Sequence, residues 1–142
     1  MGVRQMLNLD YRCMECAQEI VDSIDKSDSK KMKELENNLR KALGVLQEDG
    51  VYAMFLWLEK NASRVREKLV EFFNKEDENT HVKLSNYFLG ENKSFSPNFD
   101  EFCKDLREVA ENLDKLLFMK KLLERTLTYA LYHVKAKRDK NE

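Results

Sequence analysis

Cys13 and Cys16 stand three positions apart, the spacing at which two thiolates can reach one zinc ion or form a redox pair. A structural zinc site needs a second pair of ligands, but Cys103, His81 and His133 stand singly in the sequence. No strand and loop precede the pair, as a redox motif would require. We therefore predict that both cysteines are small buried or half-buried helical side chains, with neither a metal nor a disulfide.

The two histidines have no suitable partners nearby in the sequence. Glu78 and His81 match one half of a carboxylate-bridged dimetal motif, which needs a second such pair and two further glutamates. His133 lies between Tyr132 and Val134, with no carboxylate one helical turn away to orient its ring. The four glycines form neither a phosphate loop nor a nucleophile elbow. We therefore expect no enzyme activity, no catalytic residue, no metal and no cofactor.

Basic residues gather at the C-terminal end of the chain. Residues 115–140 contain eight Lys or Arg and two acidic residues, a net charge of +6, whereas residues 1–114 contain 17 basic and 23 acidic residues, a net charge of −6. In a regular helix at 100° per residue, five polar side chains fall within about 40° of one line: Lys121, Arg125, Thr128, Tyr132 and Lys135. The apolar residues Leu123, Ala130 and Val134 lie on the opposite side.

This polar row suits phosphate oxygens, because Lys and Arg supply charged donors while Thr and Tyr hydroxyls add uncharged ones. The candidate nucleic-acid-binding residues are Lys121, Arg125, Lys135, Lys137 and Arg138. A second interpretation stays open at this point. Cations near a helix C-terminus also favour the helix dipole and keep a surface hydrated.

A long C-terminal helix must carry this row. Pro97 and Asn98 form a start signal, which Glu101 completes as a capping pair. Apolar residues then recur at alternating spacings of four and three as far as Val134, with Lys120 as the exception. Because no Gly or Pro intervenes, we predict a nearly uninterrupted helix over residues 99–138.

Helical periodicity also predicts three earlier amphipathic helices, over residues 3–24, 32–46 and 63–74. Ser27 or Ser29 is the expected cap of the second helix. Residues 51–58 form an apolar octet that we interpret as a helix, because no second strand-like run is present to pair with it.

The connecting segments are short. We expect a surface loop over residues 75–80, a short helix over residues 81–89 that ends at Gly90, and a polar, mobile loop over residues 91–97. The predicted fold class is all-α. Residues 1–142 form a single helical domain, a compact bundle of five to seven helices with long N- and C-terminal helices.

Composition narrows the cellular setting. The chain has 142 residues and a net charge of −1, so its overall field does not favour nucleic acid or membrane. We find no apolar run near the ~18 residues of a membrane span and no signal-type core. Three cysteines, an odd number, favour reduced thiols. We expect a cytoplasmic protein without a membrane partner.

The order of these features resembles the small all-helical subunit of the type III-B CRISPR effector, the Cmr complex. In that family, two helices, the second of which ends at Gly, precede an apolar and aromatic segment that stands here at residues 50–58. The family's C-terminal helix resembles residues 113–137, with residues 126–131 (Thr-Leu-Thr-Tyr-Ala-Leu) as its core and a basic tail. The resemblance covers most of the chain and departs from the family over residues 76–97.

The resemblance implies a non-catalytic, structural role in antiviral defence. Family members stack on one another as an inner filament beside the subunits that carry the guide RNA, while other subunits cut the target RNA. The implied partners are guide RNA, target RNA, the other subunits and further copies of this chain. The helix with Lys121, Arg125 and Lys135 is then the RNA-facing element, and Leu117 is a candidate for subunit contacts.

Two other classes remain open. The chain is alternatively a helical protein–protein adaptor without nucleic-acid contact, in which the basic row is a hydrated surface. Affinity that falls steeply with salt would indicate phosphate contacts, because an apolar interface responds little to salt. A metal enzyme built on a helical bundle is the other class, and metal analysis of the purified protein tests it.

Overall fold

The computed structural model describes residues 8–141, and the side chains of residues 8–138. Seven helices form in this range: α2 (Leu9–Asp22), α3 (Ser29–Asp49), α4 (Val51–Asn61), α5 (Ser63–Asn74), α6 (Leu84–Leu89), α7 (Phe99–Ala110) and α8 (Leu113–Asn141). The same range contains no β-strand, and an isolated antiparallel bridge joins Glu76 and Lys83. The predicted all-α bundle is confirmed.

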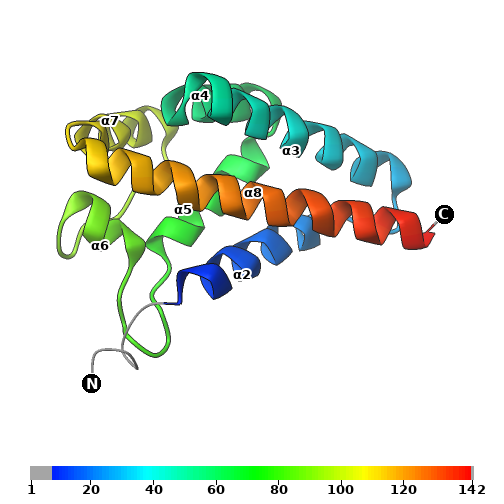
Figure 1. Cartoon of the computed structure of the whole chain (residues 1–142), viewed down its shortest axis with the longest axis horizontal. Coiled ribbons are helices and arrows are strands. Elements are labelled where there is room, and N and C mark those ends of the chain that lie inside the picture. The colour runs from blue at the N-terminus through cyan, green and yellow to red at the C-terminus, as the bar shows by residue number, and fades with distance from the viewer. Residues whose placement is uncertain (1–7, 142) are drawn as a thin grey trace.

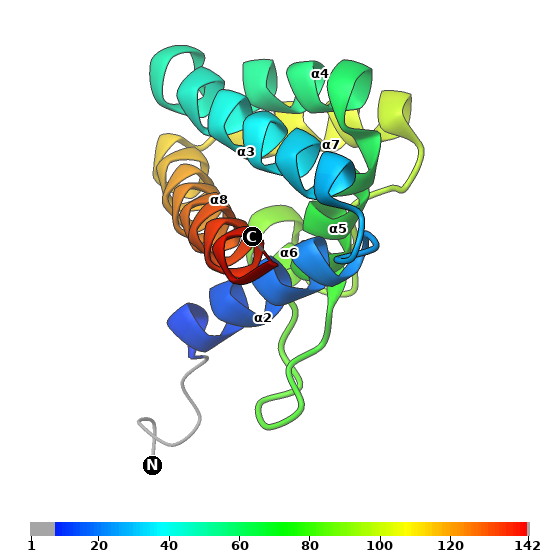
Figure 2. The same cartoon turned by 90° about the vertical axis from the view of Figure 1, so that its right-hand side faces the viewer.

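The helix α8 runs along the length of the molecule (Figure 1). Seen end-on, it lies between α3 on one side and α2 on the other (Figure 2), and these two helices make its main contacts. The helices α4, α6 and α7 gather at the end where α8 begins. One face of α8 therefore stays open between its two neighbours.

The apolar octet is helical, as predicted, and forms most of α4. Its Met54, Phe55 and Leu58 are fully buried, whereas Tyr52 is 50% exposed. Gly50 separates α4 from α3 with a φ of 98°, a conformation that glycine adopts without strain. Among the described residues, no helix combines the length and the apolar character that a membrane crossing requires.

The helix starts differ in part from the predictions. Asn98 caps α7 as predicted, because its side chain accepts a hydrogen bond from the Glu101 amide at 3.1 Å. The cap of α3 is Asp28, which accepts from two backbone amides, so the choice of Ser27 or Ser29 is wrong. The helix predicted from residue 3 is described from Leu9 onward, and residues 3–7 of that prediction lie outside the described residues.

The predicted helix over residues 99–138 is divided in two, which corrects that expectation. The helix α7 ends at Ala110, and Asn112 then caps α8 by accepting a hydrogen bond from the Lys115 amide at 3.2 Å. An asparagine side chain competes with the helical pattern of backbone hydrogen bonds, so it favours a helix start over a helix interior. As a result Leu113, expected on the buried stripe, is 66% exposed.

The segment between α5 and α7 makes more contacts with the core than its polar composition suggests. Phe95 in the predicted polar loop is 1% exposed and packs against Phe73, with ring centroids 5.2 Å apart. Both backbone groups of Phe95 bond the Asn74 side chain, at 2.8 and 2.9 Å. The helix predicted from His81 begins at Leu84 instead, since His81 has a φ of 57° and lies in the preceding loop.

Candidate functional site

The polar row on α8 faces outward, as its helical spacing predicts. Its exposed members are Lys121, Arg125 and Tyr132. Its half-buried members are Thr128 and Lys135. On the opposite side Leu123, Ala130 and Val134 are fully buried. The row therefore stands on a helix whose opposite face is packed into the core.

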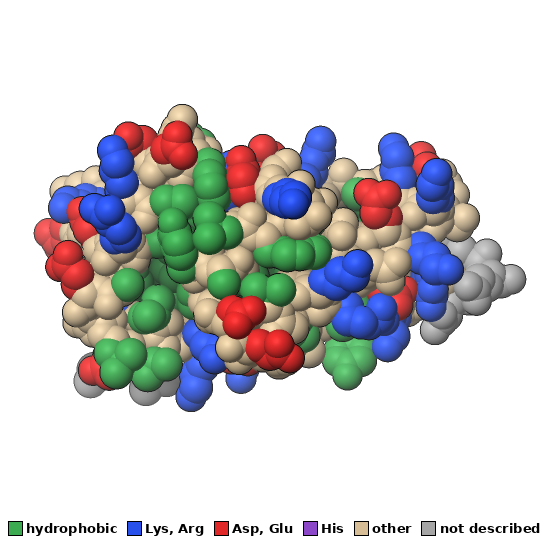
Figure 3. All heavy atoms as spheres, turned by 90° about the horizontal axis from the view of Figure 1, so that it is seen from above, with side chains coloured by type: hydrophobic (Ala, Val, Ile, Leu, Met, Phe, Trp, Pro, Cys, Tyr) green, Lys and Arg blue, Asp and Glu red, His purple; other side chains and the backbone are tan. Residues whose placement is uncertain are grey.

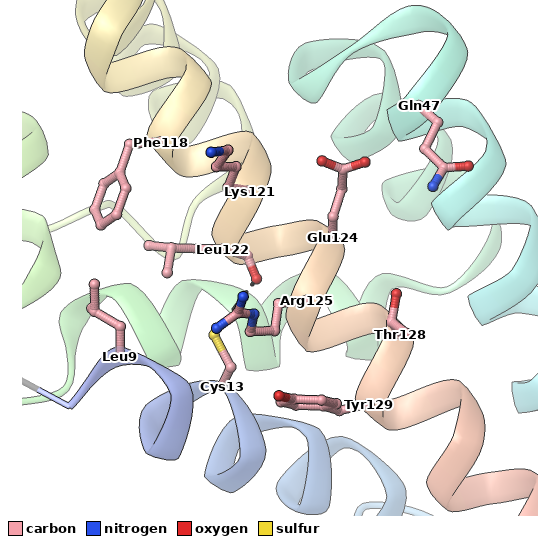
Figure 4. Close-up of a pocket in the computed structure, with 10 residues that line it drawn as sticks. All are labelled: Leu9, Cys13, Gln47, Phe118, Lys121, Leu122, Glu124, Arg125, Thr128 and Tyr129. Carbon is pink, nitrogen blue, oxygen red and sulfur yellow. Dashed lines mark hydrogen bonds between the residues drawn. The ribbon is translucent and has the colours of Figure 1, made fainter.

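The first half of this row borders an open hollow of about 590 Å³ (Figure 4). Lys121, Arg125 and Thr128 project into it from α8, while Leu9 comes from α2 and Gln47 from α3. The remaining lining residues are Cys13, Phe118, Leu122, Glu124 and Tyr129. The hollow thus joins a charged rim, with Lys121, Arg125 and Glu124, to an apolar floor.

A carboxylate from α2, that of Asp10, pairs with two side chains that line the hollow, Arg125 and Tyr129. Asp10 Oδ1 lies 3.1 Å from Arg125 Nη1 and accepts a hydrogen bond from the Tyr129 hydroxyl at 2.5 Å. This bond raises the pKa of Tyr129, because a phenolate would face the carboxylate. Tyr129 is therefore a hydrogen-bond donor near neutral pH. Side chains that are 115 and 119 positions apart in the sequence meet at this point.

Cys13 and Cys16 are buried, as predicted. The Cys13 thiol donates to the Leu122 carbonyl at 3.7 Å, and the Cys16 thiol donates to the Lys68 carbonyl at 3.9 Å. Burial raises the pKa of both thiols, so each stays protonated near neutral pH. Among the residues that the structure describes, no three His, Cys, Asp or Glu side chains gather to hold a metal ion.

The second half of the row lies in a different environment. Lys135 Nζ lies over the Tyr132 ring, 5.6 Å from its centroid. Burial, and then the charge of Lys137, lower the pKa of His133. Asp22 at the end of α2 opposes this shift. His133 is thus neutral near pH 7, with both cations and the Asp22 carboxylate in its surroundings.

Arg138 is held by the fold. Its Nε atom lies 3.3 Å from Glu36 Oε1, and the other oxygen of Glu36 accepts from Arg40 at 2.7 Å. The Glu36 side chain is 6% exposed, so this carboxylate is enclosed by the two guanidinium groups and the core. Of the five candidate residues, the structure brings Lys121 and Arg125 to one hollow and places Lys135, Lys137 and Arg138 toward the end of α8.

Sequence reasoning did not single out Tyr129 and Gln47, which line the hollow, or Asp10, which pairs with two of its lining residues. Tyr129 stands four residues, or one helical turn, after Arg125, so the helical spacing alone predicts that the two side chains are neighbours. Asp10 and Gln47 have no such signal, because Asp10 pairs with Arg125 and Tyr129 from α2, and Gln47 lines the hollow from α3. Their positions follow from how the three helices pack.

The fold and this surface define an all-helical protein with a basic, hydroxyl-bearing helix face. Such a face provides charged and uncharged donors for anionic oxygens. Comparisons with protein-family models, with curated proteins and with solved structures found no match to this chain.

Proposed function

We propose that this chain is a non-catalytic RNA-binding subunit of a Cmr-type effector complex, which stacks along guide and target RNA in antiviral defence. The observation that carries the proposal is the first half of the row on α8. Lys121 and Arg125 are exposed there, next to the hydroxyl of Thr128. The resemblance of residues 50–58 and 113–137 to the small Cmr subunit supplies the kind of complex.

This surface suits the backbone of RNA rather than its bases. Lys and Arg donors neutralise phosphates and release counterions, which gives affinity without sequence preference. The row follows one helix, so its donors are spaced along a line, as the phosphates of a strand are. A subunit that coats RNA of any sequence needs this property.

Contacts with neighbouring subunits need a second surface. Leu113 and Leu117 at the start of α8 are 66% and 51% exposed, and Tyr52 and Leu56 of α4 are also exposed. Figure 3 shows hydrophobic side chains gathered over the half of the molecule where α4, α7 and the start of α8 lie, while several Lys and Arg gather near the end of α8. The apolar half is the proposed stacking surface for other copies or subunits.

The test is a triple charge reversal, Lys121→Glu, Arg125→Glu and Lys135→Glu, assayed in the assembled complex. We expect weaker RNA association for every RNA sequence tested. The slope of log affinity against log salt should fall by about 0.7 for each phosphate of single-stranded RNA that is no longer neutralised. The assembled complex is used because neighbouring subunits raise the effective concentration.

A matched control reverses three exposed cations elsewhere: Lys60, Arg64 and Lys93. It changes the net charge equally, so it separates a local surface from a general charge effect. The control should retain RNA association. A triple α8 variant that assembles normally and binds RNA like the wild type at every salt concentration would refute the proposal.

The exposed apolar residues favour one alternative, a helical adaptor that binds only proteins. In that case the apolar half with Leu117 and Leu56 is the functional surface. Replacing Leu117 with Ser would then abolish partner binding, and salt would have little effect. In the RNA-binding proposal the same substitution weakens stacking but leaves the salt dependence of RNA association intact.

A further inference from the structure

Asp10 occupies a position at which an outside anion would find two donors. Its Oδ1 atom faces both the Arg125 guanidinium and the Tyr129 hydroxyl. A phosphate oxygen can accept hydrogen bonds from the same pair of donors. The two paired side chains, Asp10 and Arg125, are 47% and 56% exposed. A pair so exposed is weak, since water and salt screen it. A phosphate that replaces the carboxylate accepts from the same two donors, so it regains the ion pair with Arg125 and the hydrogen bond from Tyr129.

The floor beside this pair is apolar. Leu9, Phe118 and Leu122 line the hollow, and in Figure 4 the first two lie at the end away from Tyr129. Gln47 and Thr128 stand on the other side with side-chain amide and hydroxyl groups. A volume of about 590 Å³ is within the roughly 300–1,000 Å³ of small-molecule sites. The hollow can take a flat apolar ring next to the anion position.

The charge of the hollow limits how many phosphates it accepts. Lys121 and Arg125 supply two cations, while Glu124 and Asp10 supply two anions. When a phosphate displaces Asp10, Glu124 still repels further negative charge. The hollow therefore matches one phosphodiester group rather than a polyphosphate.

We infer that this hollow binds one unpaired nucleotide of an RNA strand, whose phosphate displaces the Asp10 carboxylate from Arg125 and Tyr129 while its base lies on Leu9 and Phe118. The inference rests on the proposed function, because the same helix face must meet the strand. A base inside a duplex is stacked on both faces and cannot enter. Single-strand binders commonly combine a basic groove with an aromatic side chain for the base.

The experiment measures fluorescence anisotropy of the full chain at low salt with a short labelled oligouridine. Asp10→Asn removes the competing negative charge but keeps the shape, so affinity should rise severalfold. In Asp10→Asn combined with Arg125→Gln the gain should disappear. The control Asp100→Asn removes an exposed acidic residue from the first turn of α7, the helical position that Asp10 has in α2, and should change nothing.

Two further probes test the base. An abasic strand of the same length should bind about tenfold more weakly than oligouridine, because base stacking is lost. A duplex should bind without any gain from Asp10→Asn. Circular dichroism confirms that each variant is folded before it is assayed.

The outcomes separate this inference from the proposed function. If Asp10→Asn binds oligouridine no better than the wild type, or if abasic and normal strands bind equally, the nucleotide site is wrong. The proposed function then still stands when the triple reversal on α8 abolishes RNA association in the assembled complex. If the triple reversal has no effect there, the proposed function fails regardless of these probes.

Discussion

The two halves of the basic row on α8 look alike in sequence but differ in what holds them. In the first half, Arg125 pairs with Asp10, and both side chains are about half exposed. Just past the second half, and off the line of the row, Arg138 pairs with Glu36, whose side chain is 6% exposed. The same guanidinium and carboxylate chemistry is therefore open to solvent at one end and enclosed at the other.

Burial decides what each pair can do. An exposed pair contributes about 0–1 kcal/mol to stability and exchanges readily with water or an outside anion. An enclosed carboxylate must keep its partners, because losing them leaves a desolvated charge. The first half of the row is thus available for binding, whereas Arg138, beyond the row, fastens the end of α8 to α3.

The largest expected effect is on stability. Glu36→Ala should lower the free energy of unfolding by about 1–3 kcal/mol, because it removes a nearly buried carboxylate that pairs with both Arg40 and Arg138. Asp10→Ala should cost less than about 1 kcal/mol. Urea unfolding followed by circular dichroism measures both. Equal losses from the two substitutions would remove the distinction between the two halves.

The next effect is on RNA binding. Reversing Lys121 and Arg125 to Glu should weaken RNA association by about tenfold, or 1.4 kcal/mol. Reversing Lys135 and Lys137 should weaken it less than about threefold, because Lys135 packs over Tyr132 and Lys137 is half-buried. Filter binding of the assembled complex at several salt concentrations measures the loss of RNA affinity in each double variant. A larger loss from the second pair would place the RNA surface at the end of α8.

A smaller effect is expected at Cys13, whose thiol bonds the carbonyl of Leu122 beneath the hollow. In Asp10→Ala, alkylation of Cys13 should speed up by less than about fivefold, because the exposed ion pair that Asp10 makes is worth under about 1 kcal/mol. Mass spectrometry of alkylated peptides measures this, with the half-buried Cys103 as the internal reference.

Titration after denaturation without reductant should find all three thiols free; a lower count contradicts the prediction.

The smallest effect concerns how the stability of the protein depends on pH through His133, near the end of α8. Burial and Lys137 lower the pKa of His133 below its ordinary value near 6.5. The unfolded chain therefore takes up the proton first as pH falls. The stability from His133 is complete above about pH 6.5 and is lost as pH falls through the lowered folded pKa. The melting temperature should fall less between pH 7 and pH 5 in His133→Gln than in the wild type. An equal fall in both proteins would show that other groups cause the pH dependence.

Much of the fold could be predicted because helical periodicity is local. The spacing of apolar residues identified the face of α8 that carries Leu123 and Val134, and the lack of a pairing partner identified α4 as a helix. Segments where one side chain overrides the pattern were missed. Asn112 divides the C-terminal helix by capping α8, and Asn74 draws the loop at Phe95 into the core.

The candidate site was predictable only on its helical side. A row of Lys and Arg shows which side chains share a helix face, but it does not show which of them other helices will pair. Lys121 and Arg125 were identified from the sequence, whereas the difference between Arg125 and Arg138 was not. It depends on carboxylates that come from α2 and α3.

The sequence by itself determined that this protein is helical, which face of its last helix is buried, and that the opposite face is basic, because these properties depend on residues within a few turns of one another. Tertiary structure alone decided that Asp10 meets Arg125 and Tyr129 across more than a hundred residues, and that Glu36 holds Arg138. Contacts of this kind follow from the packing of α2 and α3 against α8. No local spacing in the chain encodes them.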